Sequence, residues 1–104
     1  MSDAELVSSV LSGDTRRFEA LVDRYLPMVR ALCASHVYTE AVHDDLVQET
    51  FVEGYLKLNT LRRADRFGPW LAQIARRKCQ TWLRREGSKQ RAMNRLTHES
   101  APPP

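Results

Sequence analysis

A chain of 104 residues has room for a single domain, and a hydrophobic content of 42% supplies a modest core. The net charge of +3 divides unevenly, because residues 1–60 carry ten acidic and five basic side chains and residues 61–104 carry three acidic and eleven basic ones. No apolar run approaches the length of a membrane span and the start lacks a secretory signal, so a cytoplasmic protein is expected. The basic second half favours a polyanionic partner.

The spacing of apolar residues predicts an all-α fold: a compact bundle of three main helices plus a short N-terminal helix. Asp3 is expected to cap the short helix, and Gly13 to end it. Asp14 or Thr15 caps the second helix. Pro27 is expected to kink that helix without dividing it, because the apolar stripe continues across the proline.

The third helix is expected at about residues 39–58. Asp45, Glu49 and Glu53 stand four apart on one side of it. The apolar positions recur at three- and four-residue steps on another side: Leu46, Val47, Phe51, Gly54, Tyr55 and Leu58. By spacing alone, such an acidic stripe is most often a solvated face.

Metal binding and catalysis find little support in the sequence. His36, Glu40 and His43 stand at steps that resemble a ligand set, but a turn between them breaks the common face. The acidic residues beside His43 have no nucleophile or oxyanion hole nearby. Cys33 and Cys79 match no metal-ligand spacing, so they are expected to be free core residues. No metal, cofactor or enzymatic activity is expected.

An arginine-rich loop at residues 59–68 leads to a last helix. Pro69 suits its first turn, and Gly87 is expected to end it. One face is apolar, and another carries Trp70, Gln73, Arg77, Thr81 and Arg84. Residues 1–87 are expected to form the domain. Residues 88–104, basic and then Pro-rich, are expected to be a largely disordered start of a linker, helical at most to about residue 96.

Three segments, in the same order, resemble region 2 of bacterial RNA polymerase sigma factors of the extracytoplasmic-function (ECF) group. Residues 13–25 (GDTRRFEALVDRY) are similar to the family's opening helix. Residues 45–51 (DLVQETF) are similar to its polymerase-binding helix, and residues 67–76 (FGPWLAQIAR) to its promoter-reading helix. The resemblance implies a sigma factor domain that acts in transcription initiation.

The polymerase-binding motif implies a protein partner. In the family this motif grips the clamp helices of the largest subunit of core RNA polymerase. The matching residues are Asp45, Gln48 and Glu49, with Val52 nearby. Carboxylates and an amide on a rigid helix suit charge-assisted hydrogen bonds to a basic partner helix.

The loop and the last motif imply recognition of the promoter minus-ten element as single-stranded DNA of the non-template strand. Trp70 matches the tryptophan at the junction between duplex and single strand, and Phe67 is expected to anchor the loop to the core. Gln73, Arg77 and Arg84 continue the DNA-binding stripe. The residues that match the base-capturing loop are Leu61, Arg62, Arg63, Ala64 and Asp65.

Some features depart from the family pattern. Many relatives have an aromatic residue where Leu61 stands, and asparagine where Arg77 stands, so the preferred base is open. The family's second helical domain is lacking, so the chain is expected to be an isolated domain of a longer protein, or else a protein that works with region 2 alone. An anti-sigma factor is a further implied partner. Two alternatives stay open: a regulator that reads duplex DNA, and an interaction module sequestered by an anti-sigma factor.

Overall fold

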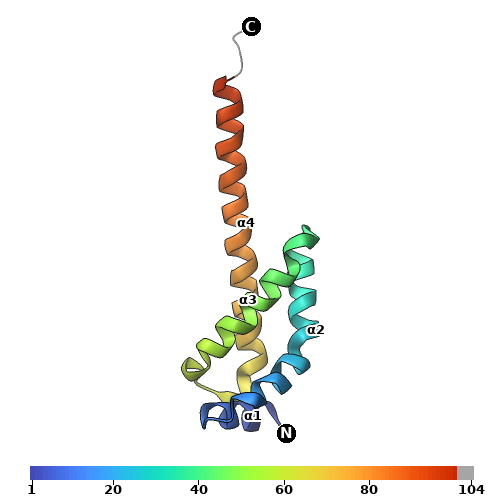
Figure 1. Ribbon diagram of the computed structural model, residues 1–104, viewed down its shortest axis with the longest axis vertical. Coiled ribbons are helices and arrows are strands. Elements are labelled where there is room, and N and C mark those ends of the chain that lie inside the picture. Colours follow the sequence, from blue (N-terminus) through green and yellow to red (C-terminus); the bar gives the residue numbers. More distant parts are fainter. Residues whose placement is uncertain (101–104) are drawn as a thin grey trace.

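The computed structural model describes the backbone of residues 1–100 and the side chains of residues 1–98. Within that range the protein is all-α and contains no strand, which confirms the expected fold class. Helices α2, α3 and α4 pack against one another, and α1 lies across their base (Figure 1). The four helices are α1 (Asp3–Leu11), α2 (Phe18–His36), α3 (His43–Leu56) and α4 (Phe67–Ser100), with single 3₁₀ turns at Thr15–Arg17, Glu40–Val42, Leu58–Thr60 and Ala64–Arg66.

The N-terminal cap of α1 differs from the prediction. Ser2, rather than Asp3, caps the helix: its hydroxyl accepts a hydrogen bond from the Glu5 N–H (3.1 Å), and the Glu5 carboxylate accepts one from the Ser2 N–H (3.0 Å). Asp3 lies one position inside the helix and faces α2. There it pairs with Arg24 (2.6 Å) and accepts a hydrogen bond from the Tyr25 hydroxyl. The Asp3 carboxylate therefore joins two helices instead of capping one.

The connection from α1 to α2 follows the prediction in part. Gly13 ends the α1 segment with a φ of 113°, a backbone conformation that favours glycine. The Asp14 side chain makes no capping hydrogen bond and instead pairs with Arg17 (3.2 Å). The α2 helix begins at Phe18, after a 3₁₀ turn. It continues across Pro27 as a single helix, as predicted.

The aromatic centre of the core joins α2 to the start of α4. Phe67 is fully buried, and its ring lies 5.4 Å from that of Tyr25 and 5.9 Å from that of Trp70, which confirms its predicted anchoring role. A Cβ atom on Gly68 would lie 2.9 Å from the Tyr25 ring, so only glycine allows this close approach. Burial, reinforced by the hydrogen bond to Asp3, raises the pKa of Tyr25 to about 12.

The apolar side of α3 packs as its spacing predicts, with Leu46, Val47, Phe51 and Gly54 buried, as is Leu58 just beyond the helix. Tyr55 differs, because 41% of it is exposed while its ring edge packs on Phe18 at 5.2 Å.

The free cysteines Cys33 and Cys79 are fully buried in α2 and α4, as predicted. Burial, together with the neighbouring Cys79 thiol, raises the pKa of Cys33 to about 12, so the thiol stays protonated. None of the described helices is long and apolar enough to cross a membrane.

Helix α4 is longer than predicted at both ends. It begins at Phe67, so that Pro69 falls within the first turn, and it continues through Gly87 to Ser100. The predicted ends at residue 87 and at about residue 96 were wrong. A glycine inside a helix costs only about 1 kcal/mol, and the next turn is supported by the pair Glu86–Lys89 (3.2 Å). The predicted disorder of residues 101–104 lies outside the described residues, and the division of the chain at residue 87 stays a prediction.

Candidate nucleic-acid and protein interfaces

Four side chains on α3 form one exposed surface, here called the α3 face. Asp45, Gln48, Glu49 and Val52 lie at steps of three and four residues, and all four are exposed. The buried residues of α3 hold the opposite side of the helix against the core, so the α3 face points to solvent. The structure therefore brings together the four residues predicted to bind a protein partner.

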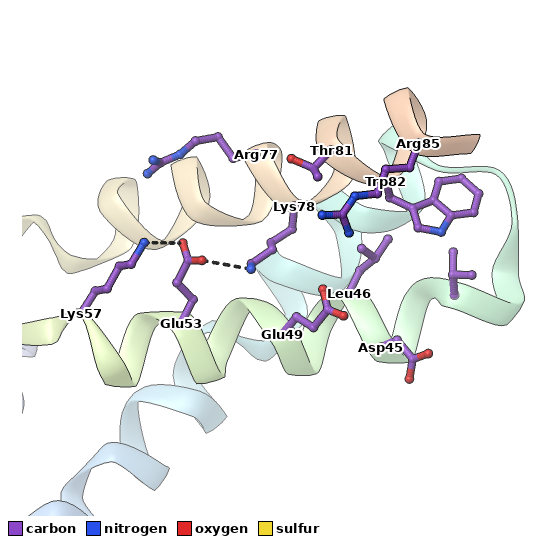
Figure 2. A pocket seen from close by; sticks show the side chains of 11 residues that line it. Asp45, Leu46, Glu49, Glu53, Lys57, Arg77, Lys78, Thr81, Trp82 and Arg85 are labelled. Carbon is purple, nitrogen blue, oxygen red and sulfur yellow. Dashed lines mark ion pairs between the residues drawn. The ribbon is translucent and has the colours of Figure 1, made fainter. Parts of the chain in front are cut away.

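Glu53 behaves differently from the other carboxylates of α3. Its side chain lies between two amines, with Lys78 of α4 at 2.9 Å and Lys57 at 3.7 Å (Figure 2). The hydrogen bond from Lys78 is the main reason that the pKa of Glu53 is lowered. Asp45 and Glu49, by contrast, form no ion pair with any side chain in residues 1–98. Both carboxylates of the α3 face are therefore available to a basic partner.

A cleft of about 370 Å³ separates α3 from α4 beside the α3 face (Figure 2). Asp45 and Glu49 line its acidic wall, and Arg77, Lys78 and Arg85 line the basic one. Trp82 closes one end and packs in part against the core. The cleft therefore brings the acidic and basic surfaces of the molecule to opposite walls of one depression.

Leu56 belongs to the same surface, although the sequence did not single it out. It is 70% exposed and lines a shallow apolar depression of about 360 Å³ together with Gln48 and Val52. An apolar residue at helical spacing is usually assigned to the core. Its position in the helix could have predicted this exposure, because Leu56 follows Val52 by four residues and lies away from the Leu46 side of the helix.

A second depression, here called the loop pocket, forms between residues 60–66 and the first turns of α4. Its volume is about 490 Å³. Leu61, Pro69 and Trp70 provide apolar walls, while arginines and an amide surround them. The polar members of the lining are Thr60, Arg62, Arg63, Arg66 and Gln73. Five of the predicted DNA-binding residues thus meet in one pocket, joined by Arg66, which the sequence placed in the loop but not in the site.

Two predicted loop residues lie beside the pocket rather than in its lining. Asp65 accepts two hydrogen bonds from the Arg63 guanidinium, at 2.9 and 3.2 Å, while both side chains remain exposed. Ala64 is half-buried and packs against the core. In this arrangement the ion pair with Asp65 orients the Arg63 side chain, and the contact of Ala64 with the core anchors the loop.

Trp70 is held at the base of the loop pocket. Its ring packs on Phe67, and it is half-buried, so one part of the indole belongs to the core and another lines the pocket. Arg77 and Arg84 follow at seven-residue steps, both exposed, outside the pocket lining. The predicted DNA-binding residues therefore divide into a pocket and a row along α4.

The histidines lie in backbone contacts. His36 Nδ1 lies 2.9 Å from the Leu32 carbonyl oxygen, and His43 Nε2 contacts the Val37 carbonyl oxygen. Across the side chains that the structure describes, no group of three or more histidine, cysteine, aspartate or glutamate residues is placed to hold a metal ion.

A family model described as Sigma-70 region 2 matches residues 21–89. The chain belongs to the sigma-70 region 2 family. It is 32% identical over 87 residues to the ECF RNA polymerase sigma-E factor of Haemophilus influenzae, an alignment that covers 84% of this chain and 46% of the relative. It is 34% identical to the Escherichia coli K12 protein of the same name, with 84% and 45% covered. The chain therefore spans about half the length of these curated relatives.

A solved structure of the same family has a similar fold. The NMR structure of an engineered region 2 of sigmaE in complex with GTAAAA matches this chain with a TM-score of 0.77 and 32% identity. The match covers 86% of this chain and 93% of that one. The predicted resemblance to an ECF sigma region 2 is confirmed by this structure and by the sequence relatives.

Proposed function

We propose that this chain is the promoter-recognition domain of an ECF sigma factor. In this role it captures the non-template strand of the minus-ten element in the loop pocket and docks on the clamp helices of core RNA polymerase through the α3 face. The observation that carries the proposal is the loop pocket, an apolar cavity beside a half-buried tryptophan with three arginines in its lining.

The loop pocket suits an unstacked base and its phosphates. Base stacking on an aromatic side chain contributes about 1–3 kcal/mol per base, and Trp70 offers part of its ring at the pocket. Arg62, Arg63 and Arg66 supply positive charge for the flanking phosphates. The structural relative was solved in complex with GTAAAA, and its match covers 86% of this chain.

The α3 face suits a basic helix of a protein partner. Asp45 and Glu49 present unpaired carboxylates within residues 1–98, and Gln48 offers an amide between them. Val52 and Leu56 add apolar area beside these polar groups, as expected of an interface with a small apolar centre.

Such a domain needs binding energy and no chemistry of its own. Capturing bases from one strand favours the open duplex over the closed one, because the bound state exists only when the strands are apart. The proposal therefore describes a protein that is not an enzyme, needs no cofactor and works in the cytoplasm, where the polymerase is. An anti-sigma factor that covers either surface would inhibit it.

The DNA half of the proposal is tested by fluorescence anisotropy with a labelled GTAAAA oligonucleotide and a permuted sequence of the same composition. Wild type should prefer GTAAAA, and Arg62→Ala/Arg63→Ala should weaken binding roughly tenfold, because two phosphate contacts are lost. Arg16→Ala/Arg30→Ala removes the same charge from exposed positions elsewhere and should bind like wild type. Equal loss in both variants would sink the pocket assignment.

The polymerase half is tested by co-purification with bacterial core RNA polymerase. Gln48→Ala/Glu49→Ala should abolish capture, whereas Arg62→Ala/Arg63→Ala should leave it intact. The matched control, Asp23→Ala/Gln80→Ala, removes one carboxylate and one amide from exposed positions off the α3 face. Failure of wild type to bind core polymerase would contradict this half of the proposal.

A further inference from the structure

The loop that lines the loop pocket has little regular structure of its own. Between Leu56, the last residue of α3, and Phe67, the first of α4, the backbone forms only two single 3₁₀ turns, Leu58–Thr60 and Ala64–Arg66. A segment with few backbone hydrogen bonds of its own takes its position from the surface on which it packs. The shape of the loop pocket therefore depends on what lies beneath residues 57–66.

Helix α1 lies beneath this loop (Figure 1). Among the elements that are distant from α1 in the sequence, the turn Ala64–Arg66 is its main packing partner, and α1 also contacts the turn Leu58–Thr60 and α4. The inner side of α1 belongs to the same apolar cluster as Leu61 and Ala64 of the loop. This inner side consists of the buried residues Leu6, Val7 and Val10. Helix α1 therefore supports the loop side of the pocket.

The start of α1 is held on α2 by polar contacts of one carboxylate. Asp3 pairs with Arg24 (2.6 Å) and accepts a hydrogen bond from the Tyr25 hydroxyl. Arg24 also donates to the Met1 carbonyl oxygen (2.8 Å). A helix of nine residues is marginal by itself in water, so contacts of this kind decide where it rests. Asp3, Arg24 and Tyr25 are here called the α1 latch.

The tyrosine of the α1 latch also supports the other side of the loop pocket. The Tyr25 ring lies 5.4 Å from the Phe67 ring and in close contact with Gly68. The Phe67 ring in turn lies 5.9 Å from the ring of Trp70. Because close-packed side chains leave no free space to absorb a shift, a displacement of Tyr25 would move Phe67 and Trp70 as well. The α1 latch is thus connected to both sides of the pocket, the loop and the indole.

We propose that Asp3 and Tyr25 are positioning residues for base capture, which act through α1 and Phe67 to set the separation between the loop and Trp70. This inference rests on the proposed function, because it concerns how well the loop pocket discriminates between strands. Neither side chain lines the pocket. A pocket that is about 1 Å too loose keeps its arginines but fits a base poorly. The loss should therefore fall on sequence preference rather than on overall affinity.

The test measures the ratio of the affinities for GTAAAA and for a permuted sequence of the same composition, by fluorescence anisotropy with the full chain. Asp3→Ala should lower this ratio about fivefold, because the loss of charged hydrogen bonds loosens the α1 latch. Tyr25→Phe keeps the ring and removes only the hydroxyl, so it should lower the ratio about twofold. The affinity for the permuted sequence should not fall in either variant, because the arginines of the pocket remain.

The matched control is Asp23→Ala, which removes a carboxylate from an exposed position of α2 and so changes the net charge equally. It should keep the ratio of the wild type. Capture of core polymerase should be unchanged in all three variants, because α3 packs mainly against α2 and α4. If Asp3→Ala and Tyr25→Phe both lose polymerase capture as well, the α1 latch serves general stability and the positioning role is contradicted.

Amide hydrogen exchange of the free chain separates this inference from the proposed function. Exchange in residues 58–66 should be faster in Asp3→Ala than in wild type, and unchanged in Asp23→Ala. If wild type shows no preference for GTAAAA but this difference in exchange is found, the loop-pocket function fails and the support of the loop by the α1 latch is upheld. If wild type prefers GTAAAA and the two aspartate variants keep equal ratios, the inference is overturned.

Discussion

The α3 face and the α4 stripe, a row of polar and basic residues along α4 that includes Arg77, Arg84, Arg91 and Arg95, lie on neighbouring helices of one small bundle. They carry opposite charges and differ in how far the bundle supports them. The α3 face sits on a helix whose other side is buried along its whole length, and it combines two free carboxylates with apolar Val52. The α4 stripe starts on the bundle and continues onto a helix that stands alone (Figure 1). The core uses only the inner side of each helix, so the outer sides are free to take different partners.

Both surfaces depend on the core packing around Phe67, so a substitution that disturbs this packing should damage both. Phe67→Ala should lower the free energy of unfolding by about 3–5 kcal/mol, because a fully buried ring that joins α2 to the start of α4 is lost. Urea denaturation followed by circular dichroism measures the loss. Phe67→Leu should cost less than half as much, and equal costs for the two variants would contradict a packing role for the ring.

Leu56→Ala should weaken the α3 face alone. Removing an exposed leucine from the edge of a protein interface should lower affinity for core polymerase about fivefold, at no cost to stability. Titration of a labelled chain with core polymerase gives the affinity. Leu83→Ala is the control, because Leu83 is also exposed but lies on α4, away from both surfaces. If the two variants bind alike, Leu56 lies outside the interface.

Lys78→Ala should remove the ion pair that joins α4 to Glu53 of α3. The pair with Glu53 is partly exposed, so its loss should cost about 1 kcal/mol or less in unfolding free energy at neutral pH. Because the pKa of Glu53 is lowered in the fold, the pair stabilises the protein above the ordinary pKa of 4.5 and fades as pH falls below it. Unfolding curves between pH 3 and 7 should show the wild type and variant converging in acid. A difference that is constant with pH would indicate packing alone.

Gly87→Ala should have the smallest effect, and only on the outer half of α4. A Cβ atom there meets nothing closer than the flexible end of Arg91 at 3.4 Å, and alanine favours helix by about 1 kcal/mol over glycine. Amide hydrogen exchange should slow in residues 84–98, whereas global unfolding by urea should not change, because those residues lie outside the bundle. A shift of the global midpoint would show that the outer helix is coupled to the core.

Much of the site could be predicted from the order of residues. The α3 face and the predicted members of the loop pocket were identified by the resemblance of short motifs to sigma region 2, and helical register and a short loop, both local properties, keep each group together in space. What could not be predicted depends on partners far along the chain. Asp3 and Ser2 are both good caps, and contacts with Arg24 and Tyr25 in α2 decide that Asp3 faces inward. The pairing of Glu53 with Lys78 likewise needs two helices to be adjacent.

The sequence by itself determined the helices, their apolar sides and the division between an acidic first half and a basic second half, because periodicity and charge are written residue by residue. Only the tertiary structure decided which carboxylates stay free, which arginines surround one pocket and that the two core thiols are neighbours, because these depend on how helices pack. It also decided that Gly87 does not end α4. The cost of one glycine is small beside the support of the turns on either side, and the basic row continues past it in one register.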